Sequence, residues 1–408
     1  MEDITSMKTR YIRGLLAGLT TLWIAACGGS GSDDSGPPPP LNGPITQPTV
    51  LNLYPNQYTG RDALFTVLVT SVGTVSVNMP LGFDTGSAGV TLYAESIFPA
   101  SMVTASGFIF PAGQTSMTFN GITVTNIEAT RSYGTVNKTV EHGNLGFAGL
   151  TFGDAHASVT TTLMPVLLFY AVDDVTGQGF APPSWQGWFG VSSTADTIEV
   201  AGAVEPAGGF DACTPQATTS CYVVSAIKYL QYGSQTNAGF MLSPAPIQTC
   251  DITTSGSCAP APMLTVGLDA SLESAFSTTA MKCPPNGYVG PASIAGYLVC
   301  QKNIPDITIA ATGASVGTYT GDAFFDTGTA YQYFSTPTGS TFPDVIQPGS
   351  TVTVTTPSGF NYTYTSADTG TDTTVVNVGA NGNSIVGVQY FTTNSFLIDF
   401  TSSIEGWK

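Results

Sequence analysis

From residue 51 onward, hydrophobic and polar residues alternate in short runs along the chain. Stretches such as LFTVLVTSV, TVSVNMPLGF, ITVTNIEAT and TVTVTT are rich in Val, Thr, Ile and Phe, and clusters of Gly, Pro, Asn and Ser separate them. Alternation over a few residues between turn-forming clusters is typical of β-strands. Helical periodicity is scarce, and its candidates are the short segments 223–230 and 270–276. The pattern therefore predicts an all-β fold of the sandwich or barrel type.

One motif of this β-rich chain occurs twice in similar surroundings. The sequence MPLGFDTGSAGVTLY surrounds Asp84, and GDAFFDTGTAYQYFS surrounds Asp326, 242 residues later. In each copy an apolar strand runs into Asp-Thr-Gly-Ser/Thr, and further apolar residues follow. A third copy, at Asp368, has polar residues on both sides, so we interpret it as an exposed turn. The repeat predicts two lobes of similar plan, each of which donates one aspartate.

The first 26 residues have the pattern of an export signal. Lys8, Arg10 and Arg13 precede an apolar run over residues 15–26, which is too short to span a membrane comfortably. The sequence Ile-Ala-Ala-Cys that ends at Cys27 resembles the lipobox of bacterial lipoproteins, in which cleavage leaves a diacylated cysteine. We therefore expect a lipoprotein signal peptide over 1–26 and a lipid anchor at Cys27. The alternative is an ordinary signal peptide that contains a cysteine.

The residues after Cys27 have the composition of a spacer. GGSGSDDSGPPPPLNGP combines a Gly/Ser stretch with a proline run, which predicts a flexible and then semi-rigid tether over residues 27–46. Gly28 directly after the cysteine resembles lipoproteins that are released to the outer membrane. We expect the protein in the cell envelope, held at the outer membrane through Cys27, on its periplasmic face or on the cell surface.

Six further cysteines fit the oxidising compartment that an exported chain reaches. They occur as three sequential couples at short separations, and the zinc site that is their alternative would lack C-x-x-C spacing. The expected disulfides join Cys213 to Cys221, Cys250 to Cys258, and Cys283 to Cys300.

Composition narrows the chemistry that the chain can perform. Charged residues make up 9% of the chain against about 25% in an ordinary soluble domain, and 27 Asp and Glu face only 10 Lys and Arg. The net charge of -17 makes nucleic acid a poor partner. The only two histidines, His142 and His156, exclude a multi-histidine metal site and leave few ways to build a Ser-His-Asp triad. We expect no metal and no cofactor, and acid-base chemistry from carboxylates.

Several motifs in order resemble the pepsin-like, bilobal aspartic peptidases. Residues 83–92 read FDTGSAGVTL, similar to the first catalytic motif of that family, and Tyr-Gly-Thr at 133–135 matches the tip of its flap. Trp-Phe-Gly at 188–190 and Ile-Val-Gly at 385–387 resemble its hydrophobic-hydrophobic-Gly elements. Asp326 lies 61 residues before Gly387, as the second catalytic motif requires, whereas Asp368 lies only 19 residues before it. The resemblance covers about residues 50–408.

The resemblance implies a fold, an activity and a set of roles. It implies two β-rich lobes, over residues 47–200 and 201–408, with a cleft between them and the three disulfides in the second lobe. Asp84 and Asp326 would activate a water molecule that hydrolyses a peptide bond, in a peptide or unfolded protein substrate, and we expect a monomer. The supporting residues would be Thr85, Gly86, Ser87, Thr327, Gly328 and Thr329, and the flap residues Tyr133, Gly134 and Thr135.

The chain also departs from the family at informative positions. Thr91 stands where a tryptophan commonly supports the flap tyrosine, and Ala330 follows the second motif where serine is usual. Residues 28–60 contain no Lys or Arg, so we expect no basic inhibitory pro-segment. Two alternatives to an active peptidase stay open: an inactive relative that binds peptide or inhibits other proteins, and a structural or adhesive surface lipoprotein.

Overall fold

The computed structural model describes residues 43–57, 63–134, 138–175, 182, 184–203, 209–250, 258–284, 291–379 and 383–408. These residues belong to the second of two units into which the chain divides after Gly36. The expected signal peptide, Cys27 and residues 27–42 of the tether lie outside the described residues, as does Thr135. Among the described residues, no helix has both the length and the apolar character that a membrane crossing requires.

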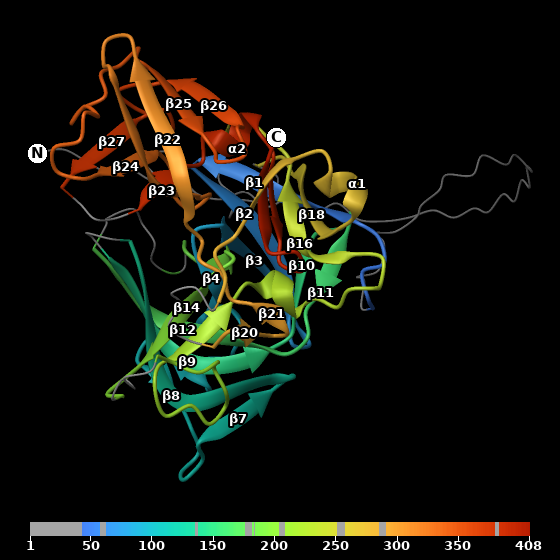
Figure 1. The fold of residues 1–408 in the computed structure, drawn as a ribbon. Helices are drawn as coiled ribbons and strands as arrows, with labels where there is room; N and C mark the ends of the chain where they lie inside the picture. The colour runs from blue at the N-terminus through green and yellow to red at the C-terminus, as the bar shows by residue number, and fades with distance from the viewer. Residues whose placement is uncertain are drawn as a thin grey trace, which may run out of the picture. The chain divides into compact units, whose positions relative to one another are not determined.

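The all-β prediction is confirmed, because strands make up most of the described structure (Figure 1). The segment 223–230 begins as the end of strand β15 (Cys221–Val224) and continues as the 3-10 turn η2 (Ala226–Tyr229). The segment 270–276 contains the single helical turn α1 (Ala270–Glu273). Each helical candidate is therefore one turn that links strands.

The described strands form two main sheets, of nineteen and seven strands, and the first aspartate ends a strand of the larger one. Strand β3 (Val75–Asp84) alternates between half-buried and exposed positions at first, and its last four residues are all buried. Strand β13 (Trp188–Val191) pairs in parallel with β3 and antiparallel with β4 (Ala88–Tyr93), so it lies between the two strands that flank the first DTG motif. Strands β8 (Ile122–Tyr133) and β9 (Thr139–Ala148) form a hairpin that leads to the expected flap.

The second aspartate follows a strand of a separate seven-stranded sheet, drawn mainly in orange and red in Figure 1. Strand β23 (Gly317–Phe325) ends one residue before Asp326. Strand β28 (Ser384–Val386) pairs in parallel with β23 and antiparallel with β24 (Gln332–Thr336). The strand arrangement around the second DTG motif thus repeats that around the first: one short strand pairs in parallel with the strand before the motif and antiparallel with the strand after it.

A third group of strands joins segments that are far apart in the sequence. Strand β1 (Thr49–Gln57) pairs through residues 49–53 with β18 (Ala261–Leu268) and through residues 54–57 with β2 (Ala63–Val72). Strand β16 (Asn237–Leu242) links β18 to β29 (Phe396–Asp399). These pairings connect the beginning of the described chain to its end.

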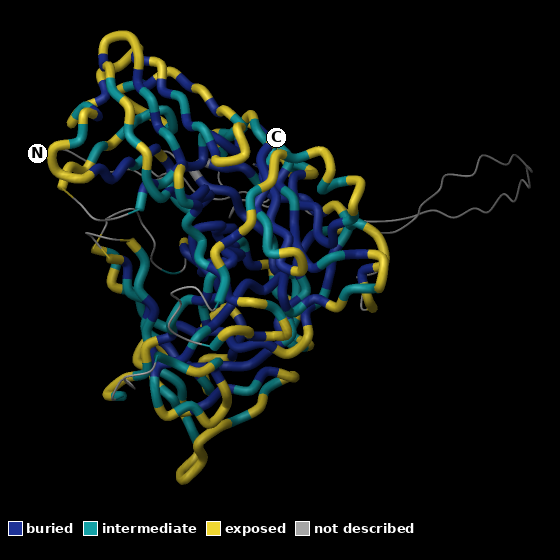
Figure 2. Tube along the Cα trace, viewed as in Figure 1, coloured by how far each residue is buried: buried dark blue, intermediate teal, exposed yellow. Residues whose placement is uncertain are grey.

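The residues before the two aspartates are fixed in aromatic clusters of the core, which appears dark blue in Figure 2. The ring of Phe83 stacks on Phe189, with centroids 6.2 Å apart, and meets Phe240 edge-on. The ring of Phe325 contacts Tyr390 at 4.7 Å. Interlocked aromatic rings resist displacement, so each DTG loop begins from a rigid point.

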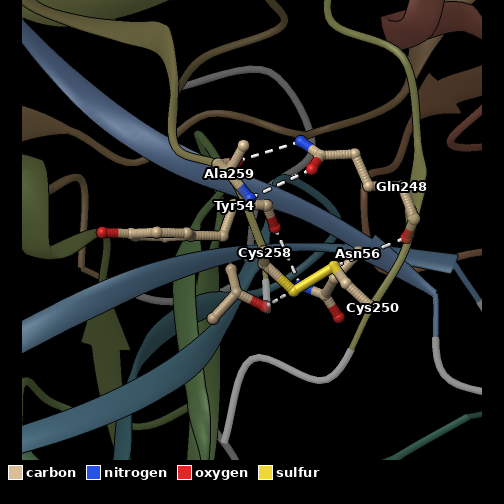
Figure 3. The surroundings of a disulfide bond; sticks show 7 residues. Tyr54, Asn56, Gln248, Cys250, Cys258 and Ala259 are labelled. Carbon is tan, nitrogen blue, oxygen red and sulfur yellow. Dashed lines mark hydrogen bonds between the residues drawn. A yellow bond between two sulfur atoms is a disulfide. The ribbon is translucent and has the colours of Figure 1, made fainter. Parts of the chain in front are cut away.

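Three disulfides join the pairs that the sequence predicts. Around Cys250–Cys258, the side-chain amide of Gln248 both donates to the carbonyl oxygen of Ala259 and accepts from its N–H, at 2.9 and 3.0 Å (Figure 3). Cys213–Cys221 packs against the hydrophobic cluster of the larger sheet, where β15 pairs with β14 (Ala195–Val200). The sequence predicts that this disulfide belongs to the second lobe, over residues 201–408. The boundary between the lobes after residue 200 stays a prediction.

Candidate active site

The two aspartates of the repeated motif meet in the structure. Asp84 is 6% exposed and Asp326 is 8% exposed, and their side-chain carboxyl groups are close enough to share a hydrogen bond. The glycine of each motif lies against the opposite aspartate. A Cβ atom added to Gly86 would lie 2.5 Å from the carboxyl carbon of Asp326, and one added to Gly328 would lie 2.8 Å from Asp84 Oδ1. Only residues without a side chain fit at these two positions.

The threonines of the two motifs bind each other's loops. The backbone N–H of Thr85 donates to Thr327 Oγ1, and the N–H of Thr327 donates to Thr85 Oγ1, both at 3.0 Å. Each hydroxyl then donates across to the other loop, from Thr85 to the carbonyl oxygen of Phe325 and from Thr327 to that of Phe83, at 2.7 and 2.6 Å. Four buried hydrogen bonds therefore fix the separation of the two carboxyl groups.

Each carboxyl group also accepts hydrogen bonds from its own loop. Asp84 accepts from the Gly86 N–H at 2.7 Å and from the Ser87 hydroxyl at 2.5 Å. Asp326 accepts from the Gly328 N–H and from the Thr329 hydroxyl, both at 2.7 Å. These donors orient the oxygens and favour the ionised form. The structure thus brings together all eight motif residues that the sequence singled out around the two aspartates.

Burial and mutual repulsion oppose ionisation of the pair. Desolvation, followed by the negative charge of Asp326, raises the pKa of Asp84 well above its ordinary value, against the lowering effect of Ser87 and Gly86. Two carboxylates in contact cannot both ionise at moderate pH, so the pair holds one proton between its two groups over a wide range. The arrangement can therefore offer an acid and a base side by side.

The pair lies in a cleft of about 720 Å³ that both DTG loops line. Tyr133 and Gly134 reach it from the end of β8, and Phe324, Tyr331 and Ile385 line it from the seven-stranded sheet. The flap residues of the described chain are thus beside the two aspartates.

The tyrosine at the flap has a different support from the one that the resemblance implies. Its ring contacts the ring of Trp188 at 5.4 Å, and the guanidinium carbon of Arg131 lies 4.9 Å from its centroid. Thr91, which replaces the family's supporting tryptophan, is fully buried and accepts a hydrogen bond from the Trp188 N–H at 3.0 Å. A tryptophan from β13 therefore packs against Tyr133 in this chain.

Two buried charged residues beneath the flap were not predicted from the sequence. Arg131 is 2% exposed, pairs with Asp196 at 2.9 Å and donates to the carbonyl oxygen of Ala88. Glu141, directly opposite Arg131 in the β8–β9 hairpin, is fully buried and accepts from Trp185 Nε1 at 3.2 Å. Burial raises the pKa of Glu141 to about 7. The sequence feature that could have indicated a role for Arg131 is its place two residues before the flap tyrosine in a chain with only 10 Lys and Arg.

Folding stability should fall as pH rises from about 5 to about 7. The raised pKa values of Glu141, about 7, and of buried Glu405, about 8, exceed the ordinary value of 4.5. The folded state therefore binds more protons than the unfolded state across this window, which lowers the free energy of unfolding as protons are removed. Thermal denaturation at pH 5 and pH 7 measures the effect.

One variant and one buried base define the pH window of this effect. Glu405 is buried and does not line the cleft. The variant Glu405→Gln should therefore reduce the fall in the free energy of unfolding between pH 5 and pH 7, because its neutral side chain does not titrate. Burial lowers the pKa of Lys228 to about 7, so this lysine adds stability with rising pH only above that value. A protein that is as stable at pH 7 as at pH 5 would contradict the prediction.

Comparison with known proteins finds similarity in the fold and none in the sequence alone. No protein-family model matches the chain, and no curated protein matches its sequence. The crystal structure of an aspartic proteinase from Irpex lacteus is similar over 88% of this chain and 97% of its own, with 14% identity and a TM-score of 0.53. The basic 7S globulin from soybean aligns over 90% and 96%, with 12% identity and a TM-score of 0.47. The chain has the fold of pepsin-like aspartic proteinases.

Proposed function

We propose that the protein is an aspartic endopeptidase in which Asp84 and Asp326 activate water for attack on a peptide bond. The observation that carries the proposal is the contact of two buried carboxyl groups, held by the reciprocal bonds of Thr85 and Thr327, in a cleft of about 720 Å³. The fold alone is compatible with other activities. A buried carboxyl pair is costly to fold, so its presence in a cleft favours a catalytic role.

In the proposed reaction the pair holds one water molecule and one shared proton. The ionised carboxylate removes a proton from the water as its oxygen bonds to the scissile carbonyl carbon. The protonated partner donates to the carbonyl oxygen, which gives a tetrahedral intermediate. When the C–N bond breaks, the protonated carboxyl group gives its proton to the leaving nitrogen, and one hydroxyl of the intermediate returns its proton to the other carboxylate, so the pair again holds one proton. The proton belongs to the coupled pair and is not assigned to one residue.

The remaining motif residues prepare the pair for this reaction. Gly86 and Gly328 allow each loop to approach the opposite carboxyl group, and Ser87 and Thr329 hold the outer oxygens. Tyr133 would cover the bound peptide and exclude water from the reacting bond, as mobile lids do. The substrate would be an extended peptide or unfolded protein segment that fills the cleft.

Cleavage of a denatured protein between pH 3 and pH 7, with and without pepstatin, tests the proposal. We expect cleavage that pepstatin abolishes, because this inhibitor binds paired catalytic aspartates. Absence of pepstatin-sensitive cleavage over the whole range would refute the endopeptidase. Binding of pepstatin without cleavage would instead identify a peptide-binding or inhibitory relative.

We also propose that the enzyme is tethered to the cell envelope through Cys27. The support is the lipobox-like sequence and the spacer composition of residues 28–46. Mass spectrometry of the mature N-terminus tests this part: a diacylated cysteine at position 27 is expected, and a processing site elsewhere would refute the anchor.

A further inference from the structure

A lysine from the second half of the chain reaches into the cleft beside the aspartates. Lys302 lies between the Cys283–Cys300 disulfide and strand β22 (Ile304–Thr312). Its ammonium group donates to the carbonyl oxygen of Gly86 and lies 4.2 Å from the ring centroid of Phe324. Lys302 and Phe324 both line the cleft. Sequence reasoning gave this residue no role.

The ammonium group of Lys302 has no anionic partner within 4.0 Å among the residues that the structure describes. Among the described residues, the contacts within 4.0 Å between a basic side chain and a carboxylate join Arg131 to Asp196 and the His142 ring to Asp173. Arg131, the buried cation of the same cleft, is thus neutralised, whereas within the described part of the chain the Lys302 ammonium group contacts a backbone carbonyl and an aromatic face. This is notable in a chain with 27 acidic residues and 10 Lys and Arg.

The segment that carries Lys302 is held in place on several sides. The Cys300 N–H donates to the carbonyl oxygen of Ser193 at 3.3 Å, and the Gln301 N–H donates to that of Lys282 at 2.8 Å. With the disulfide at Cys300, these bonds fix the backbone next to Lys302. A charge held by a rigid support loses little entropy when it binds an opposite charge.

Partial removal from water makes an unpaired ammonium group a binding site for an anion. The aromatic face and one carbonyl replace only part of its hydration, since an ammonium group carries three donors. A carboxylate that entered the cleft could accept from the remaining donors, and this interaction would be stronger there than in bulk water. The Lys302 contact is therefore suited to recognise a negative group on a ligand.

Bond lengths place this charge close to the reacting atoms. The Gly86 N–H is bonded to Asp84, and the carbonyl oxygen of the same glycine accepts from Lys302. The ammonium nitrogen must then lie within about 9 Å of the Asp84 carboxyl group. Because a peptide residue spans about 3.5 Å, an acidic side chain one or two residues from the scissile bond can reach it.

We propose that Lys302 is a specificity-determining residue that binds the carboxylate of a substrate Asp or Glu located within two residues of the scissile bond. The proposal rests on the endopeptidase function proposed above, and it narrows the substrate class to peptides with an acidic residue near the cleavage site. Lys302 takes no part in the chemical step itself.

Matched peptides that carry Glu or Gln at single positions on both sides of the scissile bond test this proposal. For the wild type we expect kcat/KM to be about tenfold or more higher with Glu at one position, as a charge-assisted hydrogen bond supplies. The ratio should fall to about one in Lys302→Gln, persist in Lys302→Arg, and favour Lys over Gln in Lys302→Glu. Lys282→Gln, an exposed cation of the neighbouring segment, should keep the wild-type ratio.

The same peptides separate this inference from the endopeptidase function. Cleavage of the Gln peptides by the wild type shows the activity regardless of Lys302. Binding of the Glu and Gln peptides to Asp84→Asn, followed by fluorescence anisotropy, tests the preference without any cleavage and should show the same Lys302 dependence. A ratio near one in the wild type, or an equal change for Glu and Gln peptides when Lys302 is replaced, would overturn the proposal.

Discussion

Asp84→Asn and Asp326→Asn should each lower kcat for peptide hydrolysis by at least about 1000-fold, the scale on which a positioned acid or base accelerates a reaction. Asparagine has the shape of aspartate and can keep the loop hydrogen bonds, but it can neither remove a proton from water nor hold the shared proton. The initial rate of cleavage of a fluorogenic peptide at the optimal pH measures the effect. Each variant should still bind pepstatin, though less tightly.

The third DTG motif provides a matched control for this experiment. Asp368 lies in the same tripeptide, but it is exposed and separate from the cleft lining. Asp368→Asn should therefore retain the wild-type rate and melting temperature. If it lost as much activity as Asp84→Asn, or if either cleft variant kept more than about a tenth of the wild-type rate, the assignment of the catalytic pair would be wrong.

Gly86→Ala should lower kcat by at least about 100-fold, because the added methyl group must displace a reacting carboxyl group. Its carbon would lie 2.5 Å from the carboxyl carbon of Asp326, well inside van der Waals contact. The carboxyl group of Asp326 cannot yield freely, since Gly328 and Thr329 hold its two oxygens. Steady-state kinetics on one peptide should show the loss mainly in kcat.

A second alanine variant controls for the substitution itself. Gly43 has open space where a Cβ atom would lie and does not need a left-handed backbone, so Gly43→Ala should leave kcat unchanged. If Gly86→Ala has a melting temperature close to that of the wild type, its loss of kcat results from a displaced carboxyl pair and not from unfolding. Near-normal kcat in that variant would show that the two loops are less constrained than their hydrogen bonds indicate.

Local sequence was sufficient to predict the parts of the site that belong to a motif. The strand before each aspartate, the glycine that approaches the opposite carboxyl group and the tyrosine at the flap all follow from a few consecutive residues. The same holds for the disulfides, whose cysteines lie 8 to 17 residues apart. In each case the partner is nearby in the sequence or is a copy of the same motif.

The polar contacts beyond the motifs could not be predicted, because their partners are distant and unrelated in sequence. Arg131 and Asp196 are 65 residues apart, and Lys302 is 216 residues from Gly86. No periodicity or spacing couples such residues, and their burial depends on how the strands are registered. The support of the flap tyrosine is a further example. The threonine at position 91 indicated that no tryptophan supports Tyr133 from there, but only the fold shows that the ring of Trp188 packs against Tyr133 instead.

The pairing of β1 with β18 has a consequence for the order in which the chain can fold. Residues 49–53 are bonded to residues 261–266, which the ribosome adds more than 200 residues later. Such a high contact order makes folding slow, because a large loop must close before the strands gain their partners. Residues 49–53 of strand β1 thus stay without these partners until most of the chain has been synthesised. The contact between Asp84 and Asp326 must form later still, because Asp326 is added after residues 261–266.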